Sequence, residues 1–568
     1  MCKQIEIWSV GNTGLRNPNR IQEGFKIFSN SPFVGKLHGK ENEINFMKFL
    51  NVKGIIQNKE GKDISGSHTR KWRLMFAKNG FIFPQISKKI GEQKNLGKED
   101  EITPFGEKFL KANTYSAVQE CFLRAMSVEQ YSIFNGTQYF SPLRWVLAIM
   151  LELENQTGSS EVTRIEFALW VQTTNPTYKV SEVVEKILDL RKRRNVSLSK
   201  RKFDKSEINE RSKNYKKSSN NFSEYCDMNM RYLRISGIFQ RKGRGLIINS
   251  TKHILAEKLA KSTTSNESLL QQYKTLCNGA SLPTDNIEIA KSLLNNLIKE
   301  LNYRHIKFDL SDLTLNTSID INIARQRLED ILAQMDEINY AQDQCNHWEE
   351  ISDYMELIMK GGGTKKYNED KIIEVPKDET PVYLEWIIWR ASLAINHIVN
   401  KPYEVRGFKI DSDFLPISTA AGGRGDLYCE FDNFVFLVEV TMSTSSRQEA
   451  MEGEPVRRHV SDAILKYKKP VYGIFIAIKI DTNTAETFRH GIWYTKEDIK
   501  QDLDILPLTL KQFRKYFLAM FKGNKVKPDK LRELILECKL EKDKLDAPTW
   551  KKYIDVTVDR KVEEIEIM

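Results

Sequence analysis

The sequence predicts a multidomain fold of mixed α+β and α/β class, and three observations support this prediction. At 568 residues the chain exceeds the roughly 250 to 300 residues at which a single hydrophobic core stops growing. The N-terminal half repeats a helix, strand, turn, strand, helix pattern, whereas short apolar strands alternate with amphipathic helices after residue 369. We therefore expect four segments: two winged-helix subdomains at 1–135 and 136–275, a helical linker at 276–368, and a domain with a mixed central sheet flanked by helices at 369–568.

The charge balance of the chain is basic. There are 87 Lys and Arg against 76 Asp and Glu, which gives a formal net charge of +11. This balance attracts polyanions over a long range and displaces their counterions, so nucleic acid is the first partner to consider. The open alternative is an ordinary soluble protein, because many of these are mildly basic.

The cysteines and the apolar segments indicate the compartment. The seven cysteines are scattered singly, with no CxxC pair and no Cys/His cluster at zinc spacing, which predicts a reduced, cytoplasmic protein without structural zinc. No apolar run approaches the roughly 20 residues that a membrane-spanning helix needs. The N-terminus "MCKQIEIWSV" lacks the pattern of a secretion signal, so we expect neither export nor a membrane anchor.

Two stretches of the N-terminal half follow the same pattern. "RLMFAKNGFIF" (73–83) and "NMRYLRISGIFQR" (229–241) each predict a helix end, a C-cap glycine and a short strand. A second strand follows in each case and leads into a helix whose N-cap residue is Thr103 or Asn249. This order of elements is typical of a winged-helix unit.

A helix-turn-helix is expected before the second of these units. "TRIEFALWVQ" (163–172) and "KVSEVVEKILDLRKRR" (179–194) are amphipathic and are separated by the turn "TTNPTY". The stretch 191–217 then holds twelve Lys and Arg with three acids. Such a basic cluster is suited to binding a phosphate backbone, and a solvated loop explains the same composition equally well. The residues expected to contact DNA are Arg70, Lys71 and Arg73 before the first wing and Arg191, Arg193, Arg194, Lys200 and Arg201 in the basic stretch, although a solvated helix face explains the first three equally well.

The segment from about 284 to 360 has helical periodicity, as in 287–302 and 322–341. Its acidic and basic residues alternate, which indicates a connector rather than a site. The three glycines of "KGGGTKK" (360–366) interrupt the pattern, and we expect a hinge there.

Two acids in the C-terminal region are expected to face each other. The stretches "YEVRGFKI", "DLYCEF" and "FVFLVEVT" predict strands, and Asp432-Asn433 is a permitted hairpin turn between the last two. Counting outward from that turn places Asp426 opposite Glu439, where like charges are destabilising unless they share a hard cation such as Mg²⁺. The alternative for Glu439, which lies in an apolar strand, is an ion pair with Arg424 or Arg447, or a position at the exposed strand end.

Three further residues are candidates for the same site. Glu385 lies near the start of a predicted helix (381–398), although an acid there commonly just complements the helix dipole. Glu452 precedes a second helix, in which Pro455 is expected at the first position, and His459 lies one turn into that helix. Both could point at the acid pair, but an isolated histidine among basic neighbours is more often a surface residue.

These residues lie in a block that resembles the AlwI family of type IIS restriction endonucleases and their strand-nicking relatives. The block is "LPISTAAGGRGDLYCEFDNFVFLVEVTMSTSSRQEAMEGEPVRRH" (415–459), supported by "TQYFSPLRWVLAIMLEL" (137–153) and "RYLRISGIF" (231–239). A block of this length with acids in a fixed order is more specific than a short motif. The similarity extends over most of the chain.

The resemblance implies a winged-helix DNA-recognition region, a helical linker and a cleavage domain of the PD-(D/E)xK nuclease type. Asp426 would be the first metal-binding aspartate and Glu439 the acid of the (D/E)xK element, with Mg²⁺ held by these two and the Val440 carbonyl. Glu385, Glu452 and His459 match positions around the family's active site. The motif lysine is replaced by Thr441, so His459 or a second metal ion would have to supply the positive charge.

The resulting hypothesis is Mg²⁺-dependent hydrolysis of DNA at an offset from an asymmetric site, in a prokaryotic cytoplasm that also contains a cognate methyltransferase. Cleavage of both strands would need a transient homodimer or a small nuclease subunit. The alternatives are a strand-specific nicking endonuclease or the large subunit of a heterodimeric enzyme, a non-catalytic winged-helix DNA-binding protein, and an RNA-directed nuclease of the same fold.

Overall fold

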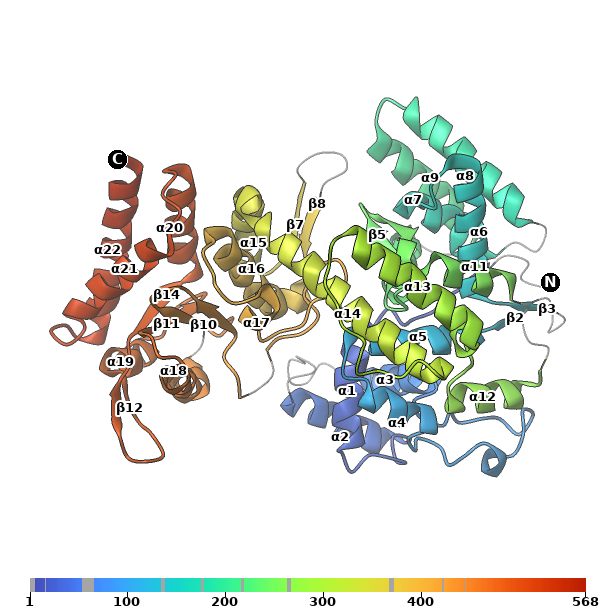
Figure 1. The fold of residues 1–568 in the computed structure, drawn as a ribbon, viewed down its shortest axis with the longest axis horizontal. Coiled ribbons are helices and arrows are strands. Elements are labelled where there is room, and N and C mark those ends of the chain that lie inside the picture. Colours follow the sequence, from blue (N-terminus) through green and yellow to red (C-terminus); the bar gives the residue numbers. More distant parts are fainter. Residues whose placement is uncertain are drawn as a thin grey trace. The chain divides into compact units, whose positions relative to one another are not determined.

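The computed structural model divides the chain into two compact units, Met1–Leu332 and Ala333–Met568, which are described separately. The structure describes residues 6–15, 17–53, 66–133, 138–174, 178–215, 219–262, 267–366, 372–420, 423–444 and 446–567. Helices dominate the N-terminal unit, and a four-stranded sheet organises the C-terminal unit (Figure 1). No helix in the described ranges has both the length and the apolar character needed to cross a bilayer.

The N-terminal unit is built from short helices with small two-stranded sheets. Its elements are β1 (Glu6–Ile7), α1 (Arg20–Ser29), α2 (Lys40–Val52), α3 (Ser67–Lys78), α4 (Pro104–Lys111), α5 (Tyr115–Val128), β2 (Tyr131–Ile133), β3 (Gln138–Phe140), α6 (Pro142–Thr157), α7 (Arg164–Glu166), β4 (Thr173–Thr174), α8 (Val180–Asn195), α9 (Lys200–Asn214), α10 (Ser219–Arg234), β5 (Phe239–Lys242), β6 (Gly245–Ile248), α11 (His253–Lys261), α12 (Leu269–Asn278), α13 (Ile287–Tyr303) and α14 (Ser318–Gln342), which continues into the second unit.

The second predicted repeat has the expected order of elements, and the first has it in reduced form. After α10, Gly237 adopts a positive φ of 72°, β5 and β6 form an antiparallel hairpin, and Asn249 accepts a hydrogen bond from the Thr251 amide. After α3, Gly80 also has a positive φ, but the two strands are reduced to a single bridge between Ile82 and Ile102. Thr103 caps α4 as predicted, since its hydroxyl accepts from the Gly106 amide at 2.8 Å.

The expected helix-turn-helix differs in its first helix. That helix is the short α7 followed by a π-helical turn, Phe167–Val171, whereas the second helix is α8. The strand β4 ends the first element, and residues 175–177 of the predicted turn lie outside the described residues.

The predicted linker is divided between the two units. Its helical periodicity is confirmed by α13 and α14, whose leucines, such as Leu297, Leu301 and Leu328, are buried in a small core of their own. The division between the units falls within α14, whereas the three glycines expected as a hinge lie in the C-terminal unit. There, Gly361 and Gly362 adopt positive φ and Gly363 begins the β7–β8 hairpin (β7 Gly363–Lys366, β8 Ile372–Val375).

The C-terminal unit surrounds one sheet in the order β14-β11-β10-β9. Its remaining elements are α15 (Trp348–Met359), α16 (Thr380–Ile395), α17 (Pro402–Val405), β9 (Leu427–Glu430), β10 (Val435–Thr441), α18 (Glu454–Lys466), β11 (Val471–Ala477), α19 (Thr482–His490), β12 (Ile492–Tyr494), β13 (Lys500–Asp502), β14 (Ile505–Thr509), α20 (Leu510–Lys522), α21 (Pro528–Glu541) and α22 (Ala547–Ile567). β9 and β10 are antiparallel, and the other pairs in this sheet are parallel. The predicted mixed sheet flanked by helices is thus present.

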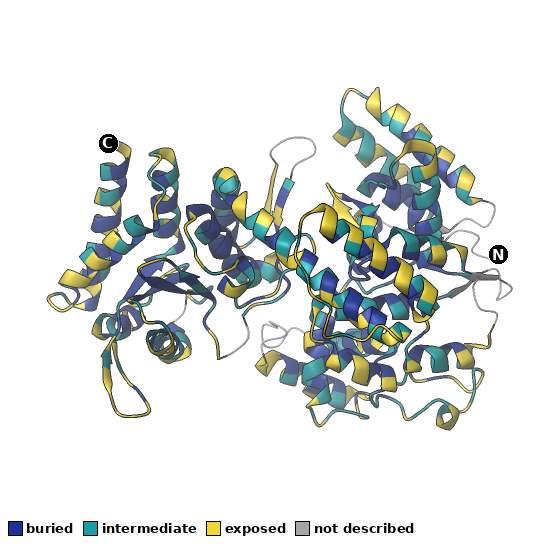
Figure 2. Cartoon of the chain, viewed as in Figure 1, coloured by how far each residue is buried: buried dark blue, intermediate teal, exposed yellow. Residues whose placement is uncertain are grey.

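The predicted hairpin register is confirmed within β9 and β10. Glu430 pairs with Val435 and Tyr428 with Leu437, and the amide of Phe431 donates to the carbonyl of Phe434 at 2.9 Å to close the turn. The central strands are buried on both faces, as their dark blue colour in Figure 2 shows. The register therefore continues outward toward Asp426 and Glu439 with little freedom to slip.

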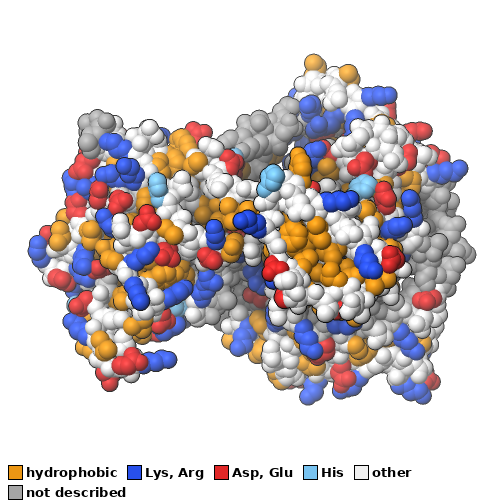
Figure 3. Space-filling view, viewed as in Figure 1, with side chains coloured by type: hydrophobic (Ala, Val, Ile, Leu, Met, Phe, Trp, Pro, Cys, Tyr) orange, Lys and Arg blue, Asp and Glu red, His pale blue; other side chains and the backbone are white. Residues whose placement is uncertain are grey.

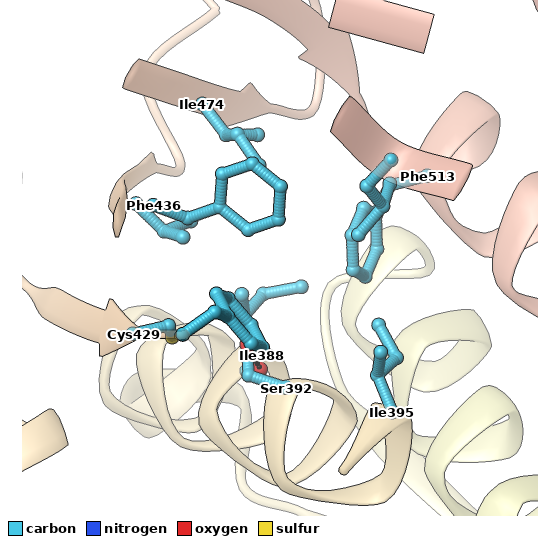
Figure 4. Close-up of a pocket in the computed structure, with 10 residues that line it drawn as sticks. Ile388, Ser392, Ile395, Cys429, Phe436, Ile474 and Phe513 are labelled. Carbon is cyan, nitrogen blue, oxygen red and sulfur yellow. Dashed lines mark hydrogen bonds between the residues drawn. The ribbon is translucent and has the colours of Figure 1, made fainter. Parts of the chain in front are cut away.

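The alternation of side chains along β10 assigns its residues to two cores. Phe436 and Val438 pack with α15, α16 and α20, where Figure 4 shows Ile388 of α16 opposite Phe436 around a cavity of about 20 Å³. Val435 and Leu437 pack with α18 and α19 on the other face. Because alternate residues share a face, Glu439 belongs to the side covered by α18.

One predicted strand is wrong. Residues 403–410 form the end of α17 and two isolated bridges, Arg406 with Leu427 and Ile410 with Pro416, rather than a strand. Pro402 favours a helix start, and the Glu404 side chain accepts from the Lys401 amide at 2.9 Å. These capping interactions outweigh the β-branched and aromatic residues that indicated a strand.

Candidate active site

Asp426 and Glu439 meet at the end of the β9–β10 hairpin, as predicted. Asp426 immediately precedes β9, and its Oδ2 accepts a hydrogen bond from the Val440 amide at 2.8 Å. The carboxyl groups of Asp426 and Glu439 are also hydrogen-bonded to each other. An ionised carboxylate can only accept, so two ionised carboxylates cannot make this hydrogen bond to each other.

Both carboxyl groups are difficult to ionise in this position. Burial, and then the negative charge of Glu452, raise the pKa of Glu439 to about 8. Burial and the adjacent Glu439 raise the pKa of Asp426 well above its usual range. The pair therefore favours a bound proton or a bound cation over two free negative charges.

Glu385 adds a third acid from the opposite side. It lies on the buried face of α16, and its Oε2 accepts from the Ala420 amide at 2.7 Å. Burial, then Asp426 and more weakly Glu439, raise its pKa well above the usual range. Glu385 lies beyond the first turn of α16, so it is not placed to complement the helix dipole, and its charge interacts with that of the pair.

Thr441, the last residue of β10, connects the sheet to Glu452. Its side chain hydrogen-bonds to the Glu452 carboxylate and accepts from the Ser443 amide at 3.1 Å. Glu452 lies in a π-helical turn, Glu449–Gly453, just before α18, and burial raises its pKa. The threonine supplies no positive charge, but it holds a fourth acid close to the end of β10.

His459 is buried and contacts Glu439 directly. Its Nδ1 lies 2.7 Å from Oε1 of Glu439, and the histidine is only 6 % exposed. The predicted alternative of a surface histidine is therefore wrong. Burial, and then the charge of Arg458, lower the pKa of His459, so the neutral imidazole is favoured at neutral pH.

The second ring nitrogen of His459 is a buried polar atom. Nε2 is buried and has no hydrogen-bond partner among the side chains and backbone groups that the structure describes. When Glu439 is ionised, Nδ1–H donates to it, which leaves the Nε2 lone pair as an acceptor. A buried acceptor without a donor is costly, so the arrangement favours a ligand or water in contact with Nε2.

Arg424, one of the two arginines considered as a partner of Glu439, has other contacts. His459 is the hydrogen-bond partner of Glu439, whereas Arg424 donates to the Glu404 carbonyl at 3.0 Å and lies over the ring of Tyr428. The charge of Arg458 favours ionisation of Glu439, but burial and the charge of Glu452 outweigh it.

The donor set matches a hard divalent cation such as Mg²⁺. Asp426 and Glu439 offer carboxylate oxygens, and the amide of Val440 points at Asp426. The carbonyl of a strand residue projects toward the same neighbour as its amide, so the Val440 carbonyl faces the same edge. No three His, Cys, Asp or Glu side chains within the described ranges form a ready-made metal-ligand group, so water and phosphate oxygens would have to complete the shell.

The arginines predicted to contact DNA are largely engaged in ion pairs within the N-terminal unit. On the face drawn in Figure 3, Lys and Arg are interspersed with Asp and Glu. Lys71 and Lys200 are half-buried, and Arg201 is exposed. The ion pairs are Arg70 with Glu43 (2.7 Å), Arg73 with Asp100 (2.7 Å) and with Glu99, Arg191 with Glu166 (2.9 Å), Arg193 with Glu207 (2.7 Å) and Arg194 with Asp204 (2.7 Å).

Sequence reasoning missed two residues that shape the site. The Tyr428 hydroxyl accepts from the Gly425 amide at 3.2 Å, next to Asp426, and Ala420 donates its amide to Glu385. A Cβ at Gly425 would lie 2.6 Å from Leu437 and 3.0 Å from Glu439 Oε1, so a larger residue there would displace both side chains. Gly425, which directly precedes Asp426, could have indicated from the sequence that side chains crowd this position, since a glycine beside a site often marks a close approach of the backbone.

Two of the solved structures to which this chain is similar are parts of restriction endonucleases. The small subunit of the heterodimeric restriction endonuclease R.BspD6I is 27% identical, with 37% of this chain and 98% of that chain covered and a TM-score of 0.29. The BpuJ1 endonuclease binding domain, solved with pyrene- and phenanthrene-modified DNA, is 11% identical, with coverage of 45% and 89% and a TM-score of 0.28. No curated protein matched the chain.

The family assignment comes from the sequence profile described as AlwI restriction endonuclease. It matches residues 78–516, which is more than half of the chain and includes the acid cluster, Thr441 and His459. The chain therefore belongs to the AlwI restriction endonuclease family.

Proposed function

We propose that this protein is a type IIS restriction endonuclease that binds an asymmetric site in duplex DNA and hydrolyses a phosphodiester at a fixed offset, with Mg²⁺ as cofactor. The observation that carries the proposal is the buried pair of Asp426 and Glu439 at the end of the β9–β10 hairpin, with His459 in contact with Glu439 and Glu385 close enough to raise the charge density of the pair. Membership of the AlwI family supports DNA as the substrate.

The acids at the sheet edge would hold the metal ion. Asp426, Glu439 and the Val440 carbonyl are its proposed ligands, all of them oxygen donors. When bound, Mg²⁺ stabilises the negative charge that develops on the phosphoryl oxygens and helps to ionise the attacking water. Asp426 and Glu439 would both be ionised when they hold the cation, because an adjacent positive charge lowers the pKa of each carboxyl group.

His459 would position Glu439 and take up a proton. Hydrolysis forms a bond from the water oxygen to phosphorus and breaks one P–O bond of the backbone, so the water loses a proton and the leaving oxygen gains one. The neutral imidazole has Nε2 as its open acceptor, which suits it to receive the proton of the water. Glu385 and Glu452 would raise the negative potential that retains the cation.

The two units suggest a separation of recognition from cleavage. The acid cluster lies in the C-terminal unit, and the predicted DNA contacts lie in the N-terminal unit. If the N-terminal unit binds the recognition sequence and the C-terminal unit hydrolyses the backbone, cleavage would occur at a distance from the recognised sequence. One active site hydrolyses one strand, so a double-strand break requires a transient homodimer or a small nuclease subunit, and a chain that pairs with neither would nick.

The test is cleavage of a defined plasmid in Mg²⁺ followed by sequencing of the released ends. We expect ends at a constant offset from one asymmetric sequence, and the ratio of nicked to linear product gives the number of strands cut. D426A and E439A should abolish cleavage while specific DNA binding persists. Site-specific binding without cleavage by the wild type would indicate the non-catalytic alternative, and normal cleavage by D426A would refute the assignment of the site.

A further inference from the structure

An open groove of about 710 Å³ lies beside the acid cluster in the C-terminal unit, between β9 and α18. It is called the Tyr428 groove here. Tyrosines and charged side chains line most of it: Tyr403, Arg424, Tyr428, Asp462, Lys466 and Tyr467.

The Tyr428 groove is continuous with the catalytic centre through both of its walls. On the strand side, Tyr428 follows Asp426 at position i+2, and residues at this spacing share one face of a strand. On the helix side, Asp462 and Lys466 follow His459 at positions i+3 and i+7, which places all three on one face of α18. The groove thus extends outward from the position proposed for the scissile phosphate.

The side chains of the groove combine cations with aromatic rings. The Tyr428 ring has Arg424 at 5.6 Å and Lys466 at 5.4 Å from its centroid, and Lys466 also lies 4.9 Å from the centre of the Tyr467 ring. Cations that contact phosphates and rings that contact sugars or bases are the usual means by which proteins hold a nucleic acid strand.

Two of the three acids in the groove are engaged by neighbouring groups. Glu430 accepts from Lys469 at 2.7 Å, and Glu404 accepts from the Lys401 amide at 2.9 Å. Asp462 is exposed on the same helix face as Lys466. A phosphate in the groove would therefore be attracted by Arg424 and Lys466 and repelled by Asp462.

We propose that the Tyr428 groove holds the stretch of DNA strand adjacent to the scissile phosphate, with Arg424 and Lys466 against its phosphates and Tyr428 and Tyr467 against its sugars or bases. This inference rests on the proposed function, because it assumes that the acid cluster hydrolyses DNA. The proposal identifies the surface of the C-terminal unit that would contact the DNA.

The experiment compares K466A and D462N with the control K468A. Lys468 is exposed and close in sequence but does not line the groove. KM and kcat are measured for a duplex that carries the recognition site, and the dissociation constant is measured as a function of salt with each substitution added to D426A. Circular dichroism melting checks the fold of each variant.

The two groove variants should change binding in opposite directions. We expect K466A to raise KM and the dissociation constant several-fold and to reduce the salt slope by about 1, because one phosphate contact is lost. D462N should lower both constants, K468A should leave them unchanged, and kcat should change little in all three.

The outcomes separate this inference from the proposed function. If the wild type cleaves DNA and the groove variants behave like K468A, the groove does not hold the substrate. Opposite shifts, with tighter binding by K466A and weaker binding by D462N, would assign the groove to a cationic or protein partner and overturn the proposal. If the wild type does not cleave, the proposed function fails, and the binding series in D426A still decides whether DNA occupies the groove.

Discussion

The Nδ1 atom of His459 lies 2.7 Å from Oε1 of Glu439, and both side chains are buried at the edge of the sheet where Asp426 also lies. The contact fixes the imidazole so that its other nitrogen, Nε2, is the open acceptor. A histidine oriented by a carboxylate can act by accepting a proton or by positioning that carboxylate, and these two contributions can be separated.

Replacement of His459 should distinguish the two contributions. We expect H459A to lower kcat by about 10² to 10⁴, because it removes both the proton acceptor and the partner of Glu439. H459N keeps a donor near Nδ1 but lacks the acceptor at Nε2. If Nε2 takes up the proton, H459N should be as inactive as H459A; recovery of activity in H459N would instead make His459 a positioning residue.

The pH dependence of cleavage provides a second measure of His459. Burial lowers its pKa, so the wild type should lose activity only as the pH falls through a value below the ordinary 6.5 of histidine. The rate profile is measured at saturating Mg²⁺, so that protonation of Glu439 does not contribute. The acidic limb assigned to His459 should be missing from the residual activity of H459N.

Thr441 should be needed for its hydroxyl. T441V keeps the shape of the side chain but removes the donor to Glu452, and loss of a hydrogen bond to a charged group costs about 1.5–3 kcal/mol. We expect kcat to fall about tenfold or more if that energy is needed to hold Glu452 in place. T441S, which retains the hydroxyl, should stay within a few-fold of the wild type; equal activity of T441V and T441S would show that the contact is dispensable.

The raised pKa of Glu439 predicts how stability depends on pH without metal. Its folded pKa of about 8 exceeds the usual 4.5, so the folded state retains a proton that the unfolded chain loses earlier. The resulting stabilisation is complete below pH 4.5 and is lost as the pH rises through 8. In EDTA, E439Q should therefore exceed the wild type in Tm at pH 8.5 by an amount equivalent to a few kcal/mol, and this advantage should vanish at pH 5.

The control for this stability measurement is D432N, which changes an exposed acid in the turn of the same hairpin. It should show no such pH-dependent gain. Addition of Mg²⁺ should raise the Tm of the wild type more at pH 8.5 than at pH 5, because protons compete for the same oxygens, and should have little effect on E439Q. A wild type and an E439Q that respond identically to pH and to Mg²⁺ would contradict both the raised pKa and the metal site.

Two arginines predicted from the sequence to contact DNA should behave differently. Arg73 pairs with the buried Asp100, so R73A should destabilise the N-terminal unit by roughly 3 kcal/mol, because it leaves an uncompensated buried charge. Arg201 is exposed, and R201A should leave the Tm unchanged but reduce the salt slope of DNA binding by about 1. Melting curves and binding titrations at several salt concentrations measure both; a lower salt slope for R73A at unchanged Tm would reverse the assignment.

The hairpin and its acids could be predicted from the sequence because the interactions that form them are local. A two-residue turn between apolar strands sets which residues pair, and the period of two then sets which face each occupies. The same local logic predicted the caps at Thr103 and Asn249. It failed at 403–410, where capping by Pro402 and Glu404 produced a helical turn instead of a strand.

The sequence by itself determined the caps at Thr103 and Asn249, the hairpin register and the meeting of Asp426 with Glu439, since turns, caps and periodicity depend on residues close together in the chain. Only the tertiary structure decided that Glu385 and His459 reach this pair, that Thr441 holds Glu452, and that five of the predicted DNA-contacting arginines form internal ion pairs. The physical reason is that burial and ion pairing depend on which distant segments pack together. The identity of a charged residue does not predict whether its side chain will contact solvent, a substrate or an opposite charge in the folded protein.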